Sequence, residues 1–235
     1  MVHFPRYAIY YAAPHGSALD RFGVEHLGYD AWNGDDVPFP DSMPPDWREL
    51  TSDPRKYGFH ATLKAPFALA PGKSEADLLA ACTDFACTPR QIPVITPVVD
   101  SISGFIAVVP AQPSDELTRL AADCVRAFDP FRAPLTAEER ARRKPEMLTE
   151  RHRDYLDRWG YPYVMEEFRF HMTLTGWLES SRRGSVLDIL SKRFQEIGLM
   201  LLEINGIALF KQMDSKSRFR NVNDWLLRSR SGPGN

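Results

Sequence analysis

Two segments of the chain alternate apolar and polar side chains in the same way. They read Phe59-His60-Ala61-Thr62-Leu63 and Phe170-His171-Met172-Thr173-Leu174, and their histidines are 111 positions apart. Because successive side chains of a strand point to opposite faces, each segment is predicted to be a strand with one apolar face that packs and one polar face that carries a His and a Thr. The same alternation adds Gly58, Lys64, Arg169 and Thr175 to the polar faces.

Hydrophobic periodicity predicts further strands and helices on both sides of these segments. Strands are expected at 7–12, 57–64, 92–99, 104–109, 167–178, 200–213 and 219–227, with Pro66 ending the second of them. Helices are expected at 17–22, 74–87, 114–128, 136–143, 149–159 and 181–197, several of them after a Ser or Thr that can serve as an N-cap. This order predicts an α+β protein in which each half runs strand, helix, strand, strand, followed by a disordered tail at 229–235.

The stretch 28–53 is rich in Pro, Gly, Asp and Trp, which is the composition of a loop. Loops of this length are usually functional or form lids. Since the stretch leads directly into the first motif strand, we expect it to cover or border a cleft.

A single histidine on a half-buried strand is usually structural, and Thr is common in strands because it is β-branched. The recurrence of the whole pattern instead favours a duplicated unit whose two polar faces meet. An imidazole titrates near pH ~6.5, so one neutral and one protonated His can act together as general base and general acid. Thr hydroxyls beside them can donate hydrogen bonds to phosphate oxygens, so this pattern suits substitution at phosphorus without a metal or other cofactor.

Composition narrows the class of protein. The 235 residues, 43% hydrophobic and 26% charged, suit one large domain or two small lobes that share a core. The formal net charge of -2 argues against a broad electrostatic grip on nucleic acid. No apolar run approaches the ~20 residues of a membrane helix, so we expect a cytoplasmic protein with no membrane partner. Three cysteines without Cys-x-x-Cys spacing indicate neither a disulfide framework nor a zinc site.

The paired motifs resemble the hallmark of the two-histidine (2H) phosphoesterase superfamily, which includes RNA 2',3'-cyclic phosphodiesterases and 2'-5' RNA ligase-like proteins. Three further segments are similar to the branch encoded in phosphonate-degradation operons, and the resemblance extends from the first strand to about Trp225. These segments are Arg6-Tyr7-Ala8-Ile9-Tyr10-Tyr11-Ala12, Leu27-Gly28-Tyr29-Asp30 and Tyr57-Gly58-Phe59-His60-Ala61-Thr62-Leu63-Lys64-Ala65-Pro66-Phe67. The resemblance implies one bilobal domain over 1–235, with pseudo-symmetric lobes at about 1–112 and 113–228. Each lobe would carry an antiparallel sheet with helices on its outer face, and the motif strands would face a central cleft.

Four further residues are candidates for substrate binding. Lys64, Arg169 and Thr175 share the predicted polar faces, and Tyr10 is the candidate cleft residue of the first strand, although a core role suits it at least as well. The basic residues of the last hairpin could hold a substrate tail, with a surface role as the alternative; they are Lys211, Lys216, Arg218 and Arg220. The other histidines, His3, His15, His26 and His152, lack a partner pattern and are expected to be structural or exposed.

These observations together predict a monomeric, metal-independent phosphodiesterase with His60, Thr62, His171 and Thr173 as catalytic residues. The expected partner is a small cyclic phosphate, and the operon-branch resemblance favours a ribosyl 1,2-cyclic phosphate. One alternative is an RNA enzyme that opens 2',3'-cyclic ends or handles 2'-5' linkages, which makes nucleic acid the less favoured partner. Another is a non-catalytic module that binds a nucleotide or sugar phosphate. A metal site on the two histidines is the least favoured, because no carboxylate or Cys stands at ligand spacing.

Overall fold

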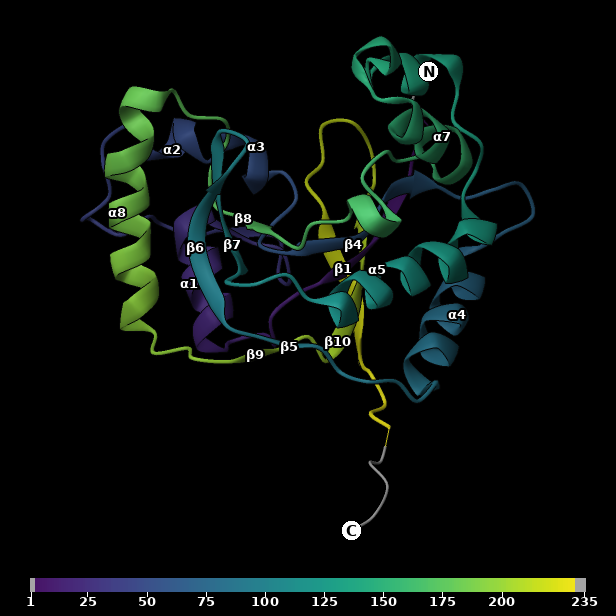
Figure 1. Ribbon diagram of the computed structural model, residues 1–235, viewed down its shortest axis with the longest axis horizontal. Helices are drawn as coiled ribbons and strands as arrows, with labels where there is room; N and C mark the ends of the chain where they lie inside the picture. The colour runs from purple at the N-terminus through teal and green to yellow at the C-terminus, as the bar shows by residue number, and fades with distance from the viewer. Residues whose placement is uncertain (1–2, 231–235) are drawn as a thin grey trace.

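The computed structural model describes residues 3–230 (Figure 1). Its helices are α1 (Ala18–Leu27), α2 (Trp47–Leu50), α3 (Ser52–Arg55), α4 (Glu75–Cys87), α5 (Asp115–Phe128), α6 (Ala137–Ala141), α7 (Glu150–Trp159) and α8 (Ser180–Glu196). Its strands are β1 (Arg6–Tyr11), β2 (Tyr29–Asp30), β3 (Asp35–Asp36), β4 (Ala61–Ala68), β5 (Val94–Ile95), β6 (Pro97–Ile102), β7 (Phe105–Pro110), β8 (Met172–Thr173), β9 (Leu202–Glu203), β10 (Gly206–Gln212) and β11 (Arg220–Leu226). No helix in this part of the chain is both long and apolar enough to cross a membrane.

The predicted α+β class is confirmed, but the main strands form one sheet rather than one sheet per lobe. The order is β11-β10-β1-β4-β8-β7-β6, and the pair Ala61–Met172 joins the two halves between β4 and β8. The halves also exchange strands: β6 and β7, from the first part of the chain, continue the sheet beyond β8, while β10 pairs with β1 and carries β11 at the opposite edge. The predicted division into lobes at about residue 112 therefore does not describe how the strands are shared.

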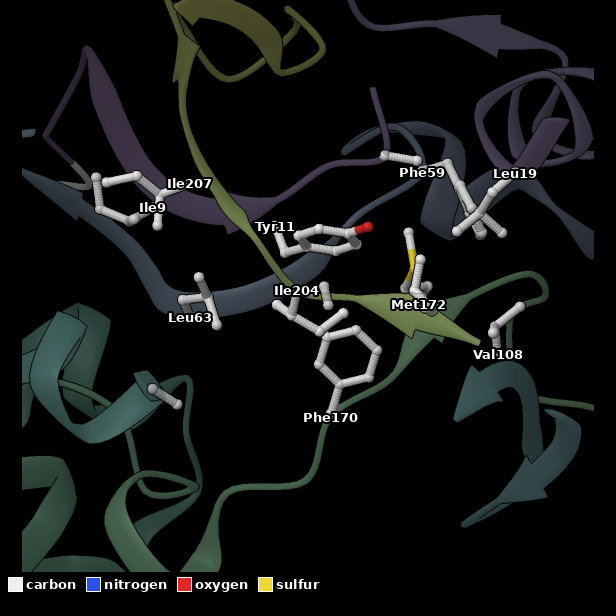
Figure 2. Close-up of a cluster of buried hydrophobic side chains, with 14 of the residues drawn as sticks. Ile9, Tyr11, Leu19, Phe59, Leu63, Val108, Phe170, Met172, Ile204 and Ile207 are labelled. Carbon is white, nitrogen blue, oxygen red and sulfur yellow. The ribbon is translucent and has the colours of Figure 1, made fainter. Parts of the chain in front are cut away.

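The apolar backs of both motifs lie in one hydrophobic core, as the alternation predicted. Ala61, Met172 and Leu174 are fully buried there, with Tyr11 of β1 beside them. Figure 2 shows Leu63, Phe59, Phe170 and Met172 in this cluster, packed with Tyr11. Since these side chains occupy one face of the joined sheet, the His and Thr of each motif are left on the other face.

Five helices, α1, α4, α5, α6 and α7, start where the sequence predicts because each has a local cap. Ser17, Ser74, Ser114, Thr136 and Thr149 all accept a backbone hydrogen bond from the first turn of the helix that follows. In Figure 1, α1 and α8 lie at one end of the molecule, and α4, α5 and α7 at the other.

The motif strands differ in length from the predicted ones. β4 starts after His60 and continues through Pro66 to Ala68. Pro66 does not end the strand as predicted, because β8 pairs with β4 only at Ala61 and the missing N–H of Pro66 breaks no hydrogen bond to β8. β8 is only two residues long, not the predicted 167–178: Met165–Glu167 forms a 3₁₀ turn, and β8 pairs with its neighbours only through Met172 and Thr173.

The stretch 28–53 is more ordered than a loop and contains β2, β3, α2 and α3. It packs against α1 and α8: Trp47 Nε1 donates to the carbonyl oxygen of His26 at 2.9 Å, and Arg182 pairs with Asp46 at 2.8 Å. The predicted disordered tail is also corrected at its start, since the Arg230 N–H donates to the Arg90 carbonyl at 2.8 Å. Residues 231–235 lie outside the described chain.

Candidate active site

The two motifs meet at the centre of the sheet. β4 and β8 are antiparallel with Ala61 opposite Met172. The same register, continued by one residue in each direction, sets His60 opposite Thr173 and Thr62 opposite His171. In this register each histidine lies opposite the threonine of the other motif on the polar face, and these four residues are called the cluster below.

Both imidazoles are oriented by the same local contact. His60 Nδ1 lies 2.9 Å from the carbonyl oxygen of Gly58, and His171 Nδ1 lies 2.7 Å from that of Arg169, two residues earlier in each case. Because a carbonyl oxygen can only accept, each Nδ1 must carry a proton, and the lone pair of the neutral ring is on Nε2. His60 Nε2 lies 3.2 Å from Thr62 Oγ1 within the cluster.

The surroundings of the two histidines differ. The ring of Tyr10 stacks on His60 with centroids 3.7 Å apart, whereas the aromatic neighbour of His171 is Phe105, tilted at 5.6 Å. Burial lowers the pKa of His60 to about 4, and the nearby charge of His171 adds to that effect. Burial also lowers the pKa of His171. Both rings are therefore favoured in the neutral form in the free protein.

A cavity of about 470 Å³ opens beside the cluster. Thr62 and His171 line it directly, while His60 and Thr173 are not on its wall. Much of the remaining wall is aromatic or polar: Phe105, His152, Tyr161, Tyr163, Glu167, Phe168 and Arg169. No residue of 28–53 lines this cavity, so the predicted lid is corrected: that stretch packs against α1 and α8 instead.

Lys64 does not face the cavity, contrary to the alternation. Between the pairs Ile9–Lys64 and Tyr10–Thr62 the register of β1 and β4 shifts by one residue, so a bulge breaks the alternation after Thr62. The Lys64 side chain is only 3% exposed and pairs with Asp129 at 3.0 Å. Its ammonium is thus used to hold β4 to the end of α5.

Thr175 and Tyr10 also have structural surroundings. Thr175 is fully buried, and its Oγ1 accepts from the Ile106 N–H at 3.0 Å and donates to the Gly176 carbonyl at 2.9 Å, so it is not available to a substrate. Tyr10 is fully buried as well, and its hydroxyl has no hydrogen-bond partner among residues 3–230. The predicted direct contact of Tyr10 with substrate is replaced by ring contact with His60.

Arg169 is the one secondary candidate that lines the cavity. Within residues 3–230 its guanidinium makes no hydrogen bond or ion pair. Of the basic residues in the last hairpin, three are held elsewhere: Lys211 by Glu75, Arg218 by Asp36 and Arg220 by the Asn33 carbonyl.

Four residues of the wall carry no functional signal in the sequence. His152 is one of the histidines expected to be structural or exposed, and Tyr161, Tyr163 and Glu167 belong to no predicted site, yet all four line the cavity. No repeat or motif marks them, because α7 and the segment after it reach the cavity only through tertiary packing. In the described part of the chain, no group of three or more His, Cys, Asp or Glu could hold a metal ion.

Paired His-x-Thr motifs on neighbouring central strands of an α+β fold are the arrangement on which the resemblance to the two-histidine phosphoesterases rests. The chain belongs to the family described as "Protein of unknown function (DUF1045)", whose model matches residues 62–220.

Two curated relatives carry the name ribose 1,5-bisphosphate phosphokinase PhnN. The one from Laribacter hongkongensis (strain HLHK9) is 33% identical over 229 residues, 94% of this chain and 52% of the relative. The one from Janthinobacterium sp. (strain Marseille) is 47% identical over 126 residues, 54% of this chain and 28% of the relative. The chain thus spans about half the length, or less, of these relatives.

Similar solved structures include E. coli LigT complexed with 3'-AMP, at 11% identity and a TM-score of 0.42 over 96% of this chain and 99% of that one. A structure described as a phosphoesterase is 13% identical, with a TM-score of 0.40 over 96% of this chain and 100% of the other. At these identities and TM-scores, the two solved structures share only a general likeness with this chain.

Proposed function

We propose that the protein is a two-histidine phosphodiesterase that opens a small cyclic phosphate with water. The observation that carries this proposal is the shared cluster, in which His60 and His171 both have Nδ1 fixed by a backbone carbonyl and each lies opposite the threonine of the other motif. Two oriented imidazoles with basic Nε2 atoms, flanked by two hydroxyls, supply a general base, a general acid and oxyanion donors without a metal.

In this mechanism one Nε2 accepts a proton from a water molecule as the water oxygen attacks phosphorus. The other histidine, protonated, gives its Nε2 proton to the sugar oxygen whose bond to phosphorus breaks. The Thr62 and Thr173 hydroxyls donate to the non-bridging oxygens, where negative charge increases during attack. Water is added across one P–O bond, so the product is a phosphate monoester with a free hydroxyl on the sugar.

The volume of the cavity and the net charge of the chain support a small substrate. A cavity of about 470 Å³ suits a single small molecule, and the net charge of -2 gives little attraction for a polyanion. Arg169 offers an unpaired cation beside His171 for the anionic part of the substrate.

The names of the curated relatives support a sugar phosphate in particular. Hydrolysis of the O2–P bond in a 5-phosphoribosyl 1,2-cyclic phosphate leaves ribose 1,5-bisphosphate, the compound named in those relatives. We therefore propose a ribosyl 1,2-cyclic phosphate, in its 5-phosphorylated form, as substrate. The kinase activity in the name is not proposed for this chain, because Gly72-Lys73-Ser74 lacks the first Gly of a phosphate-binding loop and Ser74 is the N-cap of α4.

A turnover screen tests the proposal. The purified protein is given a ribosyl 1,2-cyclic phosphate, nucleoside 2',3'-cyclic phosphates and a 2'-5' dinucleotide, each with and without exhaustive chelation. We expect the highest kcat/KM for the ribosyl substrate and no effect of chelation. Preference for the nucleotide substrates would favour the RNA enzyme, binding of all three without turnover would favour the binding module, and loss of activity on chelation would contradict the metal-free mechanism.

A further inference from the structure

A second polar pair lies on the cavity wall, on elements separate from the motif strands. His152 of α7 and Glu167 of the Met165–Glu167 turn both line the cavity, with His152 Nε2 3.1 Å from Glu167 Oε2. Their side chains are 19% and 30% exposed, so both are largely withdrawn from bulk water while still open to the cavity. The two-histidine chemistry of the motifs does not use this pair.

The pair keeps hydrogen-bonding capacity for a ligand. A carboxylate offers about four acceptor positions, and Glu167 uses one for His152 and another for a long contact to Arg151 at 3.4 Å. His152 Nδ1 has no hydrogen-bond partner among residues 3–230. Acceptor sites on Glu167 and one ring nitrogen of His152 are therefore free to bind polar groups in the cavity.

The neighbouring side chains present aromatic surfaces. Tyr163 contacts the His152 ring edge-on, with centroids 5.1 Å apart, and Tyr161 lies 5.6 Å from Tyr163. Phe168 lines the cavity close by in sequence. Aromatic faces combined with a carboxylate and an imidazole suit a ring that has both C–H faces and hydroxyl groups.

The charges around the pair select a neutral ligand group. The Glu167 carboxylate would repel a phosphate placed directly against it, while the guanidinium groups of Arg151 and Arg169 would repel an amine. Because the carboxylate can only accept, His152 Nε2 carries the proton and Nδ1 of the neutral ring holds the lone pair. Hydroxyl groups can donate to both the carboxylate and this Nδ1 without carrying charge into the cavity.

We infer that His152 and Glu167 form a subsite for the sugar hydroxyls of a substrate whose cyclic phosphate lies between the two motifs. This inference rests on the proposed function and makes Glu167 a specificity-determining residue. The subsite recognises the polyhydroxylated ring itself, and it contributes nothing to a cyclic phosphate that lacks further hydroxyls.

The test compares two cyclic phosphates in matched variants. One substrate is a ribosyl 1,2-cyclic phosphate, and the other is ethylene glycol cyclic phosphate, which has the same five-membered ring at phosphorus and no other hydroxyl. Glu167→Gln keeps the shape of the side chain and removes its charge. Glu166→Gln is the control, because Glu166 is exposed, bonds Tyr155 and does not line the cavity. His152→Phe is the second variant and keeps the ring contact with Tyr163.

We expect Glu167→Gln and His152→Phe each to lower kcat/KM for the ribosyl substrate about 10- to 100-fold, the range for losing a hydrogen bond to a charged group. Turnover of the glycol substrate should stay unchanged, and Glu166→Gln should affect neither substrate. Equal losses for both substrates would make the pair a structural clamp between α7 and the turn, and no loss for either would also overturn the subsite. If the parental protein opens neither cyclic phosphate, the proposed function itself fails, and this result is distinct from the other two.

Discussion

The ring of Tyr10 stacks on the His60 imidazole at a centroid distance of 3.7 Å and an interplanar angle of 24°. The Tyr10 hydroxyl is buried without a partner in residues 3–230, so the ring and not the hydroxyl supports the histidine. Tyr10→Phe should keep turnover close to parental, with equal or higher thermal stability, because an unpaired buried hydroxyl is removed. Tyr10→Leu should lower kcat by about tenfold or more through misplacement of His60. Steady-state kinetics and melting temperatures check this, and a large loss in Tyr10→Phe would give the hydroxyl a direct role.

Each motif histidine should be indispensable. General acid and general base typically contribute roughly 10²- to 10⁴-fold each, so His60→Ala and His171→Ala should each lower kcat by about that factor. Circular dichroism should show an intact fold, and His3→Ala, at an exposed histidine outside the cavity, is the control. Near-parental turnover in either motif variant would contradict a mechanism that needs both rings.

The threonines of the two motifs should act on the transition state. Thr62→Val and Thr173→Val keep the branched shape and remove the hydroxyl, so each should cost on the order of 2 to 4 kcal/mol in kcat/KM as an oxyanion donor does. Thr175→Val is a matched control, because its hydroxyl bonds the backbone of Ile106 and Gly176 and is fully buried. That variant should lose thermal stability more than activity. Parental kinetics in both motif variants would leave Thr62 and Thr173 as strand formers only.

The pH dependence of kcat/KM should be displaced toward acid. Catalysis needs one protonated and one neutral histidine, and burial lowers the pKa of His171 and brings that of His60 to about 4. As pH rises above the lowered pKa of the acid, its protonated fraction falls, so the alkaline limb begins earlier than for an ordinary imidazole at ~6.5. The acidic limb lies lower still, where the base becomes protonated. We expect a bell-shaped profile with its maximum below about pH 6.5, measured on the free-enzyme parameter kcat/KM; a maximum at alkaline pH would contradict it.

Features that depend on neighbours in sequence were predictable, and features that depend on distant partners were not. The N-caps at Ser74 and Ser114 and the apolar backs of both motifs follow from local chemistry and strand alternation. The burial of Lys64 does not, because the bulge that turns it away from Thr62 is defined by the register of β4 against β1.

The same distinction explains the strand exchange and the polar pair on the cavity wall. The pairing of β6 and β7 onto the half of the sheet that contains β8 depends on which strand edges are free in the folded chain. His152 and Glu167 meet only because α7 packs beside the turn before β8. Neither arrangement leaves a periodic signal in the sequence.

The segment 37–47 should contribute to stability and not to substrate selection. The sequence suggested a lid, but no residue of this segment lines the cavity, and it joins α1 to α8 instead. Trp47 is 1% exposed and donates to the His26 carbonyl, while Asp46 pairs with Arg182. Replacing 37–47 by a short Gly-Ser linker removes these contacts and the burial of a large aromatic side chain, a loss of roughly 3 to 5 kcal/mol for the Trp alone. We therefore expect a clearly lower melting temperature. Below that temperature, kcat/KM should remain close to parental for both small and long cyclic phosphates.

Arg182→Gln, which removes only the exposed ion pair with Asp46, is the mild control and should change the melting temperature little. A linker variant that melts like the parent but loses turnover of small substrates would restore the lid.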